Sequence, residues 1–521
     1  KEDELAQNAY YHLADCYLSM DKKNRAKLAF EFAAKLSYDK QIEQNALYNF
    51  AKITFQLRNT PFNDAVEAFK KYIDKYPDAE NLKEAYGYLV KAYLHSNNYK
   101  EALQSLEMID DKDIQLKQAY QKVAYYRGLE LYNNRHYDRS IAVFDRSLQY
   151  KDYYKHIAAL TYYWKGEALY QLNQFREALN SFNSFILSPG SFGSDVYHKA
   201  HYNMGYCNFK LENYPEAIKW FRKFMNMTDQ ENQEYLADTY IRLGDCYFMR
   251  RSHWQAIEYY DKAIEMNLRD QDYGLYQRAI ALGLLNRPEK KIGSLKRLTE
   301  EYPESDYLDN AYFELGRSYM NMENAQEASS HFTKVTEDYP SSNYVKQALV
   351  QLGLIYYNQD QNDKALKYYK RAVAEYPGTE EAKNALTGIK NIYVDRNNVD
   401  AYFNYVNGLG DFARVSMSEQ DSLTYISAEK LYMKQDCETA LEFFRKYLNK
   451  FENGNFSVNA HFYMADCLRG KGEKEKALSH LEYVLERPNN AFTEQALSAA
   501  ATVYHEDGEL DKAVEAYQRL E

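Results

Sequence analysis

The chain has 521 residues, of which 45% are hydrophobic and 27% charged, so it is long enough for several domains and apolar enough to form a core. Its net charge of −11 comes without a basic block, which excludes sequence-independent nucleic-acid binding through clustered lysine and arginine. Glycine and proline are scarce, at 20 and 9 residues, which argues against barrels, sandwiches and long linkers.

The first residues, KEDELAQNAYY, lack the basic start and apolar stretch of a signal peptide. They predict the middle of an amphipathic helix, so we expect the natural protein to start upstream with a targeting signal of its own. No run along the chain approaches the roughly 18 apolar residues of a membrane-spanning helix. The sequence therefore predicts no transmembrane segment in this chain.

A short motif recurs through the whole chain. Its clearest copies, such as YPEAIKWF (214–221) and NDKALKYY (362–369), hold an alanine followed four residues later by an aromatic residue. That spacing puts both side chains on one face of a helix. The alanine position recurs about every 37 residues, with Ser140 and Lys291 as the departures. Its positions are Ala26, Ala65, Ala102, Ser140, Ala178, Ala217, Ala256, Lys291, Ala328, Ala365, Ala401, Ala440, Ala477 and Ala513.

Two further positions keep the same register. Twelve residues before most of the alanines stands a small residue, which predicts a first helix lying close against the second. These are Ala14, Gly128, Gly166, Gly205, Gly244, Ala279, Gly316, Gly353, Ala428, Ala465 and Ala501. Twelve residues after four of the alanine positions, one of which is occupied by Lys291, stands a proline, where the second helix should stop. These are Pro77, Pro303, Pro340 and Pro377.

The segment MGYCNFKLENYPEAIKWF (204–221) resembles the tetratricopeptide repeat over nearly every defining position. The resemblance covers almost the whole chain and implies an all-α fold. It further implies an α-solenoid of about fourteen helix-turn-helix units that form a right-handed superhelix. The ends YPESDYLDNAYFELG and YPSSNYVKQALVQLG are similar to tetratricopeptide proteins of the bacterial cell envelope, which include outer-membrane assembly lipoproteins.

One stretch, 395–421, departs from the repeat. It has a short second helix, then Gly408 and Gly410, then a polar run. We interpret it either as a hinge or as one degenerate repeat stacked without a break. With a hinge, the domains would be an array of about ten to eleven repeats over 1–394 and one of about three over 422–521.

The last residues, AVEAYQRLE, stop without a polar cap, so we expect the chain to continue past Glu521 or to associate end to end.

Four of the five cysteines, Cys16, Cys207, Cys246 and Cys467, fall two residues after the small residue of a first helix. The repeat usually places alanine there, and cysteine serves as a small hydrophobe. We therefore predict packed, unpaired thiols rather than nucleophiles, metal ligands or disulfides. Cys207 and Cys246 lie in adjacent units, but we expect more than the ~7 Å that a disulfide allows between them. Cys437 begins a second helix and is the one cysteine that we expect to be exposed.

The tyrosines, 54 in all, predict a binding surface. Positions three before, one after and four after the small residue form a stripe on the first helices, beside the face that packs within the repeat. Aromatic residues dominate its outer positions, and tyrosine makes large contacts at low entropic cost. The alternative is that each ring packs against the next repeat. The residues that we predict to contact a partner are Tyr125, Tyr132, Tyr163, Tyr170, Tyr202, Phe209, Asp245 and Phe248.

The sequence predicts no enzyme, cofactor or metal site, because it holds no Gly-rich phosphate loop, nucleophile elbow or zinc-type spacing. An irregular site within 395–421 is the remaining enzyme hypothesis. We expect a scaffold that binds a protein or peptide in a tyrosine-rich concave groove, periplasmic or outer-membrane-associated, for envelope assembly or transport. The alternative is a regulatory or sensory arm of a cytoplasmic multidomain protein, which five unpaired cysteines would favour.

Overall fold

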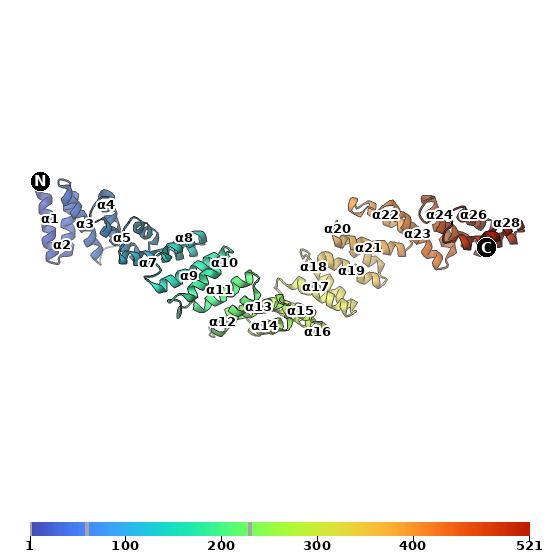
Figure 1. Cartoon of the computed structure of the whole chain (residues 1–521), viewed down its shortest axis with the longest axis horizontal. Coiled ribbons are helices and arrows are strands. Elements are labelled where there is room, and N and C mark those ends of the chain that lie inside the picture. The colour runs from blue at the N-terminus through green and yellow to red at the C-terminus, as the bar shows by residue number, and fades with distance from the viewer. Residues whose placement is uncertain (1–2, 58–61, 228–231) are drawn as a thin grey trace. The chain divides into compact units, whose positions relative to one another are not determined.

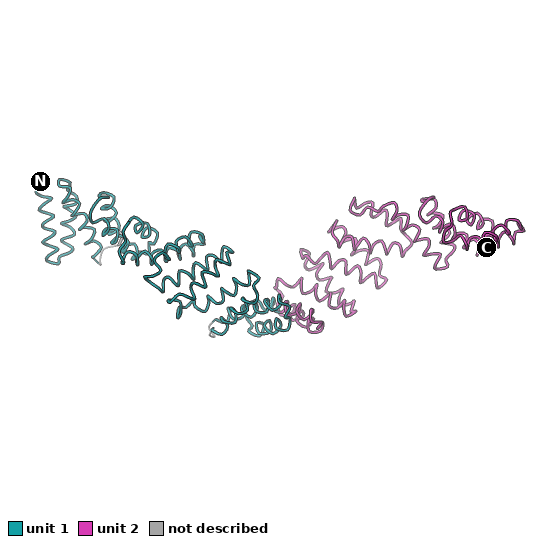
Figure 2. The backbone as a smooth tube through the Cα atoms, viewed as in Figure 1, with its two compact units in different colours: residues 1–274 teal, residues 275–521 magenta. Residues whose placement is uncertain are grey.

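The structure is a computed structural model that describes residues 3–57, 62–227 and 232–521. Over these residues the chain forms 28 α-helices and no strand, which confirms the predicted all-α fold. The chain divides into two compact units, which meet between Gly274 and Leu275 (Figure 2). Among the described residues, no helix combines the length and the apolar character that crossing a membrane requires.

Unit 1 consists of helix pairs that follow one another along the chain (Figure 1). The first helices of its pairs are α1 (Glu4–Ser19), α3 (Lys40–Gln56), α5 (Leu82–His95), α7 (Ile114–Asn133), α9 (Lys155–Gln171), α11 (Tyr197–Lys210) and α13 (Gln233–Met249). The second helices are α2 (Lys23–Lys35), α4 (Phe62–Lys75), α6 (Tyr99–Glu107), α8 (Tyr137–Leu148), α10 (Phe175–Leu187), α12 (Tyr214–Met227) and α14 (His253–Glu265).

Unit 2 repeats this arrangement, beginning within α15 (Gln271–Leu284). Its further first helices are α17 (Leu308–Asn321), α19 (Val345–Asn358), α21 (Glu380–Asp395), α23 (Met417–Met433), α25 (Ser457–Gly470) and α27 (Thr493–Glu506). Its second helices are α16 (Pro288–Glu301), α18 (Ala325–Asp338), α20 (Asn362–Glu375), α22 (Val399–Asn407), α24 (Cys437–Lys450), α26 (Lys474–Leu485) and α28 (Leu510–Leu520). A short 3₁₀ helix, η2 (Asp411–Ala413), lies between α22 and α23.

The helix boundaries follow local chemistry. The side chain of Asp113 accepts a hydrogen bond from the Leu116 amide and so caps α7. At the other end, four second helices stop two residues before a proline, which has no amide hydrogen to continue a helix. This confirms the stops predicted at Pro77, Pro303, Pro340 and Pro377, after α4, α16, α18 and α20.

In the turns that the structure describes, a residue with left-handed backbone joins the two helices of a pair. Unit 1 uses Arg135, Asn173, Glu212 and Arg251 here, at φ between 58° and 61°. Unit 2 uses glycine at two equivalent turns, Gly472 and Gly508. A side chain at positive φ crowds the backbone, so the arginines and the glutamate hold a less favourable conformation than glycine would.

Six of the small residues share one kind of partner, which is the aromatic ring four residues after the alanine position. At six glycines, an added Cβ would come within 2.3 to 2.8 Å of a ring atom of the second helix. The pairs are Gly128 and Phe144, Gly166 and Phe182, Gly205 and Phe221, Gly244 and Tyr260, Gly316 and Phe332, and Gly353 and Tyr369. The predicted close approach is confirmed, and a ring rather than a backbone fills the space.

The two departures from alanine differ in kind. Ser140 is fully buried, and its hydroxyl donates to the Gly128 carbonyl oxygen at 2.7 Å, so it keeps the small-residue packing. Lys291 does not fit this packing, and its Nζ lies 2.5 Å from Glu314 Oε2 on α17. In the stretch 395–421, Val399, Tyr402, Val406, Ala413 and Val415 are buried in one core cluster with residues of α19, α21 and α23. The hinge and the domain boundaries proposed for it stay predictions.

Two expectations about the cysteines were wrong. Cys437 and Cys467 form a disulfide with Cα atoms 5.3 Å apart, and it joins the start of α24 to the next first helix, α25. The bridge joins two different positions of the repeat, the start of a second helix and the packed position of a first helix, so the separation of equivalent positions does not exclude it. The exposed cysteine is Cys16 rather than Cys437, whereas Cys207 and Cys246 are buried as predicted.

Candidate interaction surface

Four half-buried rings lie at the same position on successive first helices of unit 1. We call them the aromatic row: Tyr132 of α7, Tyr170 of α9, Phe209 of α11 and Phe248 of α13. Each ring lies at a steep angle to the ring of the residue that begins the second helix of the same pair. The ring pairs and their centroid distances are Tyr132–Tyr137 at 5.5 Å, Tyr170–Phe175 at 5.3 Å, Phe209–Tyr214 at 5.9 Å and Phe248–His253 at 5.4 Å. The turns thus hold the row in fixed positions while leaving part of each ring exposed.

The earlier position of the predicted stripe is packed inside the repeats. Tyr125 and Tyr163 are buried, and the ring of Tyr163 lies 5.7 Å from that of Phe182 on α10. Tyr202 is half-buried, with its ring 5.3 Å from that of Phe224. The expectation that Tyr125 and Tyr163 line an open groove is therefore wrong, because the second helix of the same pair covers them. Their part in partner binding stays a prediction.

Asp245 was expected to face the same groove and is instead buried. Arg242 Nη1 donates to its Oδ2 at 2.8 Å, and the hydroxyls of Tyr260 and Tyr273 donate to its Oδ1 at 2.9 and 3.0 Å. Burial raises the pKa of the Asp245 carboxyl, against the opposing effect of Arg242 and the two hydroxyls. This carboxylate holds α13, α14 and α15 together and has little surface to offer a partner.

The acidic residue that does reach the surface is Asp238, which the sequence analysis missed. It lies one turn before Arg242 on α13, and the hydroxyls of Tyr202 and Tyr206 both donate to its Oδ2, at 2.8 and 2.5 Å. Arg242 Nε donates to the Tyr206 hydroxyl oxygen at 3.0 Å. The i, i+4 spacing of Asp238 and Arg242 was the available signal.

A hollow of about 460 Å³ opens beside Asp238. Three carboxylates and one guanidinium line it, with two tyrosines: Glu234, Asp238, Asp270, Arg269, Tyr202 and Tyr235. Its lining residues carry a net negative charge, and one of the carboxylates, Asp238, also accepts from Arg242 Nε at 3.3 Å. Tyr235 already has the Lys199 ammonium 5.1 Å from its ring centroid, which shows that a cation is accommodated against this wall.

A second acidic residue was also missed. Glu167 follows Gly166 on α9, and the hydroxyl of Tyr163 and the amide of Asn203 donate to its carboxylate. Tyr132 of the aromatic row also hydrogen-bonds to it. Burial raises the pKa of the Glu167 carboxyl to about 7, and the hydrogen bonds and the nearby Lys199 only partly oppose this.

In the part of the chain that the structure describes, no three histidine, cysteine, aspartate or glutamate residues are grouped so as to hold a metal ion.

The helix pairs with their ring-on-glycine contacts define an α-solenoid of repeated helix-turn-helix units. Sequence profiles described as tetratricopeptide repeat match residues 7–40, 125–191, 163–225, 197–269, 273–305, 310–342 and 347–379. The chain belongs to the tetratricopeptide repeat family.

Solved structures are similar to parts of the chain at low identity. The C-terminal part of a TPR repeat-containing protein from Cytophaga hutchinsonii is 18% identical, over 50% of this chain and 99% of that one, with a TM-score of 0.43. A tetratricopeptide repeat protein from Parabacteroides merdae is 14% identical over 58% and 98%, with a TM-score of 0.30. YrrB, a TPR protein with an unusual peptide-binding site, is 20% identical over 38% and 92%, with a TM-score of 0.31. No functionally curated protein matches the chain in sequence.

Proposed function

We propose that this protein is a non-enzymatic scaffold that binds a protein or peptide partner across the first helices of unit 1. The observation that carries the proposal is the aromatic row, which repeats one half-exposed ring on each of α7, α9, α11 and α13. Rings that are already fixed by a turn lose little freedom when a partner covers them, so their apolar area contributes fully to affinity. Protein and peptide binding is what tetratricopeptide proteins share, and it is consistent with this arrangement.

The charge of the surface favours a partner segment that combines apolar with basic side chains. The hollow at Asp238 carries three carboxylates against one guanidinium. A lysine or arginine of the partner that meets these carboxylates would be steered by charge as well as held by contact.

A selection from a library of 12-residue peptides displayed on phage tests this proposal. The wild-type chain should enrich peptides with aromatic or aliphatic residues beside lysine or arginine. A variant with Tyr132→Ala, Tyr170→Ala, Phe209→Ala and Phe248→Ala should retain less than a tenth of their binding. A matched variant with alanine at Tyr154, Phe192 and Trp254, three exposed rings of unit 1 outside the row, should bind as the wild type does. Equal binding by both variants would refute the proposal.

We further propose that the protein works in an oxidising compartment, the periplasm or the outer-membrane surface of a bacterial envelope, in envelope assembly or transport. The disulfide between Cys437 and Cys467 supports this, since stable disulfides are rare in the cytosol. It also removes the argument from five unpaired cysteines for a cytoplasmic regulatory arm. Alkylation of the protein from its own cells, without prior reduction, should leave the linked peptide intact. Two alkylated thiols at 437 and 467 would restore the cytoplasmic alternative.

End-to-end self-association also stays a proposal. One side of α28 exposes Leu510, Val514 and Tyr517, which recur at the spacing of a single helix face. Replacing all three by lysine should abolish any concentration-dependent dimer in sedimentation. A sedimentation coefficient that does not change with concentration in the wild type would refute self-association.

A further inference from the structure

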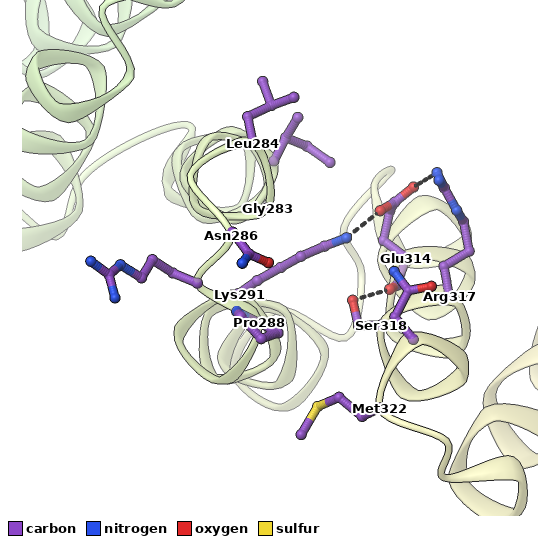
Figure 3. A pocket seen from close by; sticks show the side chains of 12 residues that line it. Gly283, Leu284, Asn286, Pro288, Lys291, Glu314, Arg317, Ser318 and Met322 are labelled. Atoms are coloured by element: carbon purple, nitrogen blue, oxygen red, sulfur yellow. Dashed lines mark hydrogen bonds and ion pairs between the residues drawn. The ribbon is translucent and has the colours of Figure 1, made fainter.

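The position of the aromatic row is occupied differently at the start of unit 2. In α15 the equivalent residue, four after the small residue Ala279, is Gly283. Where α7, α9, α11 and α13 place a ring, the structure has a pocket of about 380 Å³, lined by residues of α15, α16 and α17 and of the turn between α15 and α16 (Figure 3). Glycine opens the pocket because it places no side chain there.

Lys291 is the second departure at the same repeat. Most second helices bury an alanine at its position, such as Ala256 in α14 and Ala328 in α18. The Lys291 side chain instead runs past Gly283, where an added Cβ would lie 3.2 Å from its Cδ, and crosses the pocket (Figure 3). Its Nζ lies 2.5 Å from Glu314 Oε2 on α17. The unusual glycine and the unusual lysine are therefore parts of one feature.

The pocket carries an excess of positive charge. Its charged lining residues are Arg287, Lys291 and Arg317 against Glu314 alone, in a chain whose net charge is −11. Glu314 serves two of these cations, because Arg317 Nη1 lies 2.9 Å from its Oε1. The Lys291 and Glu314 side chains are each 13% exposed, and low exposure strengthens the field that an entering charge meets. This is the reverse of the acidic hollow in unit 1.

Apolar surface accompanies the charge. Leu284 and Met322 lie on either side of Lys291 in the view of Figure 3, and Ile280 adds to the lining. The amide groups of Asn286 and Asn321 supply further donors. An occupant that matches this lining has a short apolar stem and an anionic end.

We propose that this pocket binds an acidic side chain of a protein partner, with the carboxylate between Lys291 and Arg317 and its methylene groups against Leu284 and Met322. The inference rests on the proposed scaffold function and adds to it a site of opposite charge preference. The entering carboxylate shares the two cations with Glu314, and Arg287 adds a third positive charge. Since the chain as a whole repels acidic peptides, saturable binding of one requires a local excess of cations.

The test measures binding of fluorescein-labelled hexaglutamate by fluorescence anisotropy. The peptide is amidated at its C-terminus, so that only side-chain carboxylates can bind. The full chain should bind it saturably. Raising the salt concentration should weaken hexaglutamate binding, because the contacts are ionic.

Two variants change the pocket and should leave the fold intact. Lys291→Ala restores the alanine of the repeat and leaves Glu314 paired with Arg317. Gly283→Tyr fills the pocket with the ring that other repeats carry and removes a helical glycine. Each should weaken hexaglutamate binding at least tenfold with no loss of thermal stability. Lys290→Ala, which removes an exposed charge of α16 outside the lining, is the matched control and should bind as the wild type does.

Absence of saturable binding to the wild type, or equal affinity in Lys291→Ala and Gly283→Tyr, would overturn the pocket proposal and assign Lys291 only a structural ion pair. Either failure leaves the scaffold function standing if the aromatic-row variant still loses its selected peptides. The opposite outcome is also possible. If the pocket variants lose hexaglutamate binding and the row variant keeps its phage-selected peptides, the function proposed for unit 1 is refuted and the pocket proposal stands.

Discussion

The repeats at α13 in unit 1 and at α15 to α17 in unit 2 have the same helix-pair fold but surfaces of opposite charge. At α13 the small residue is Gly244, its ring partner is Tyr260, and Phe248 continues the aromatic row. At α15 the small residue is Ala279, and Gly283 replaces the ring of the row. At α13, Asp245 is buried and bonded to Arg242 and two tyrosines, and the charges left at the surface are mainly carboxylates, Glu234 and Asp238. The second repeat leaves cations around an open pocket, so two substitutions change the chemistry of the surface without changing the fold.

The largest expected difference between the units comes from the disulfide. The two cysteines are 30 residues apart in sequence, and closing a loop of this length lowers the entropy of the unfolded chain enough to add about 3–4 kcal/mol of stability. A Cys437→Ser/Cys467→Ser variant should show faster amide hydrogen exchange in α24 to α27, and unit 1 should be unaffected. Cys16→Ser, which alters an exposed thiol, is the control. Unchanged exchange in α24 to α27 would mean that the bridge does not form in solution.

The glycines of the two units should respond to alanine with opposite sign. Gly205→Ala puts a Cβ 2.5 Å from the Phe221 ring and should destabilise unit 1 by about 2–3 kcal/mol, since a packed core does not yield. Gly283→Ala meets only the flexible Lys291 chain and should stabilise its helix by about 1 kcal/mol. Urea denaturation measures both. A loss of stability at Gly283 as large as that at Gly205 would show that the pocket is closed in solution.

Glu167 should make the stability of unit 1 depend on pH. Its folded-state pKa of about 7 lies above the ordinary value of 4.5, so between these values the folded chain binds more protons than the unfolded chain. The carboxyl therefore favours folding below pH 4.5 and loses this effect as the pH rises through 7, by about 3 kcal/mol in all. The free energy of unfolding of wild type minus that of Glu167→Gln should fall between pH 5 and 8. A difference that is constant with pH would show that Glu167 titrates normally.

The smallest expected effect lies in the turns, where unit 1 has Arg251 at φ 59° and unit 2 has Gly472 at φ 79°. Arg251→Gly should stabilise unit 1 by about 0.5–1 kcal/mol, because glycine adopts positive φ without crowding. Gly472→Arg should destabilise unit 2 by a similar amount. The two melting temperatures should move in opposite directions, and a shift of the same sign in both would contradict the steric explanation.

Much of the fold could be predicted from the sequence, because its signals are local and repeat in register. The alanine ladder, the small residues and the prolines each specify one position of a helix pair, and the packing of Phe182 on Gly166 follows from them. The interaction surface was harder to predict from the sequence than the fold. Whether Tyr163 faces a groove or the next helix depends on a rotation of the helix that spacing alone does not settle. The pairing of Cys437 with Cys467, and of Lys291 with Glu314, depends on contacts between different repeat positions, which a comparison of equivalent positions cannot show.

The central claim, that the aromatic row contacts a partner, is tested most directly by photocrosslinking in the protein's own cells. A benzophenone amino acid in place of Phe209 lies in the row, and one in place of Trp254, an exposed ring of α14, lies outside it. On irradiation, the chain substituted at 209 should give a discrete adduct with another protein, identified by mass spectrometry, and the chain substituted at 254 should not. No adduct from 209, or the same adduct at equal yield from both positions, would contradict the account.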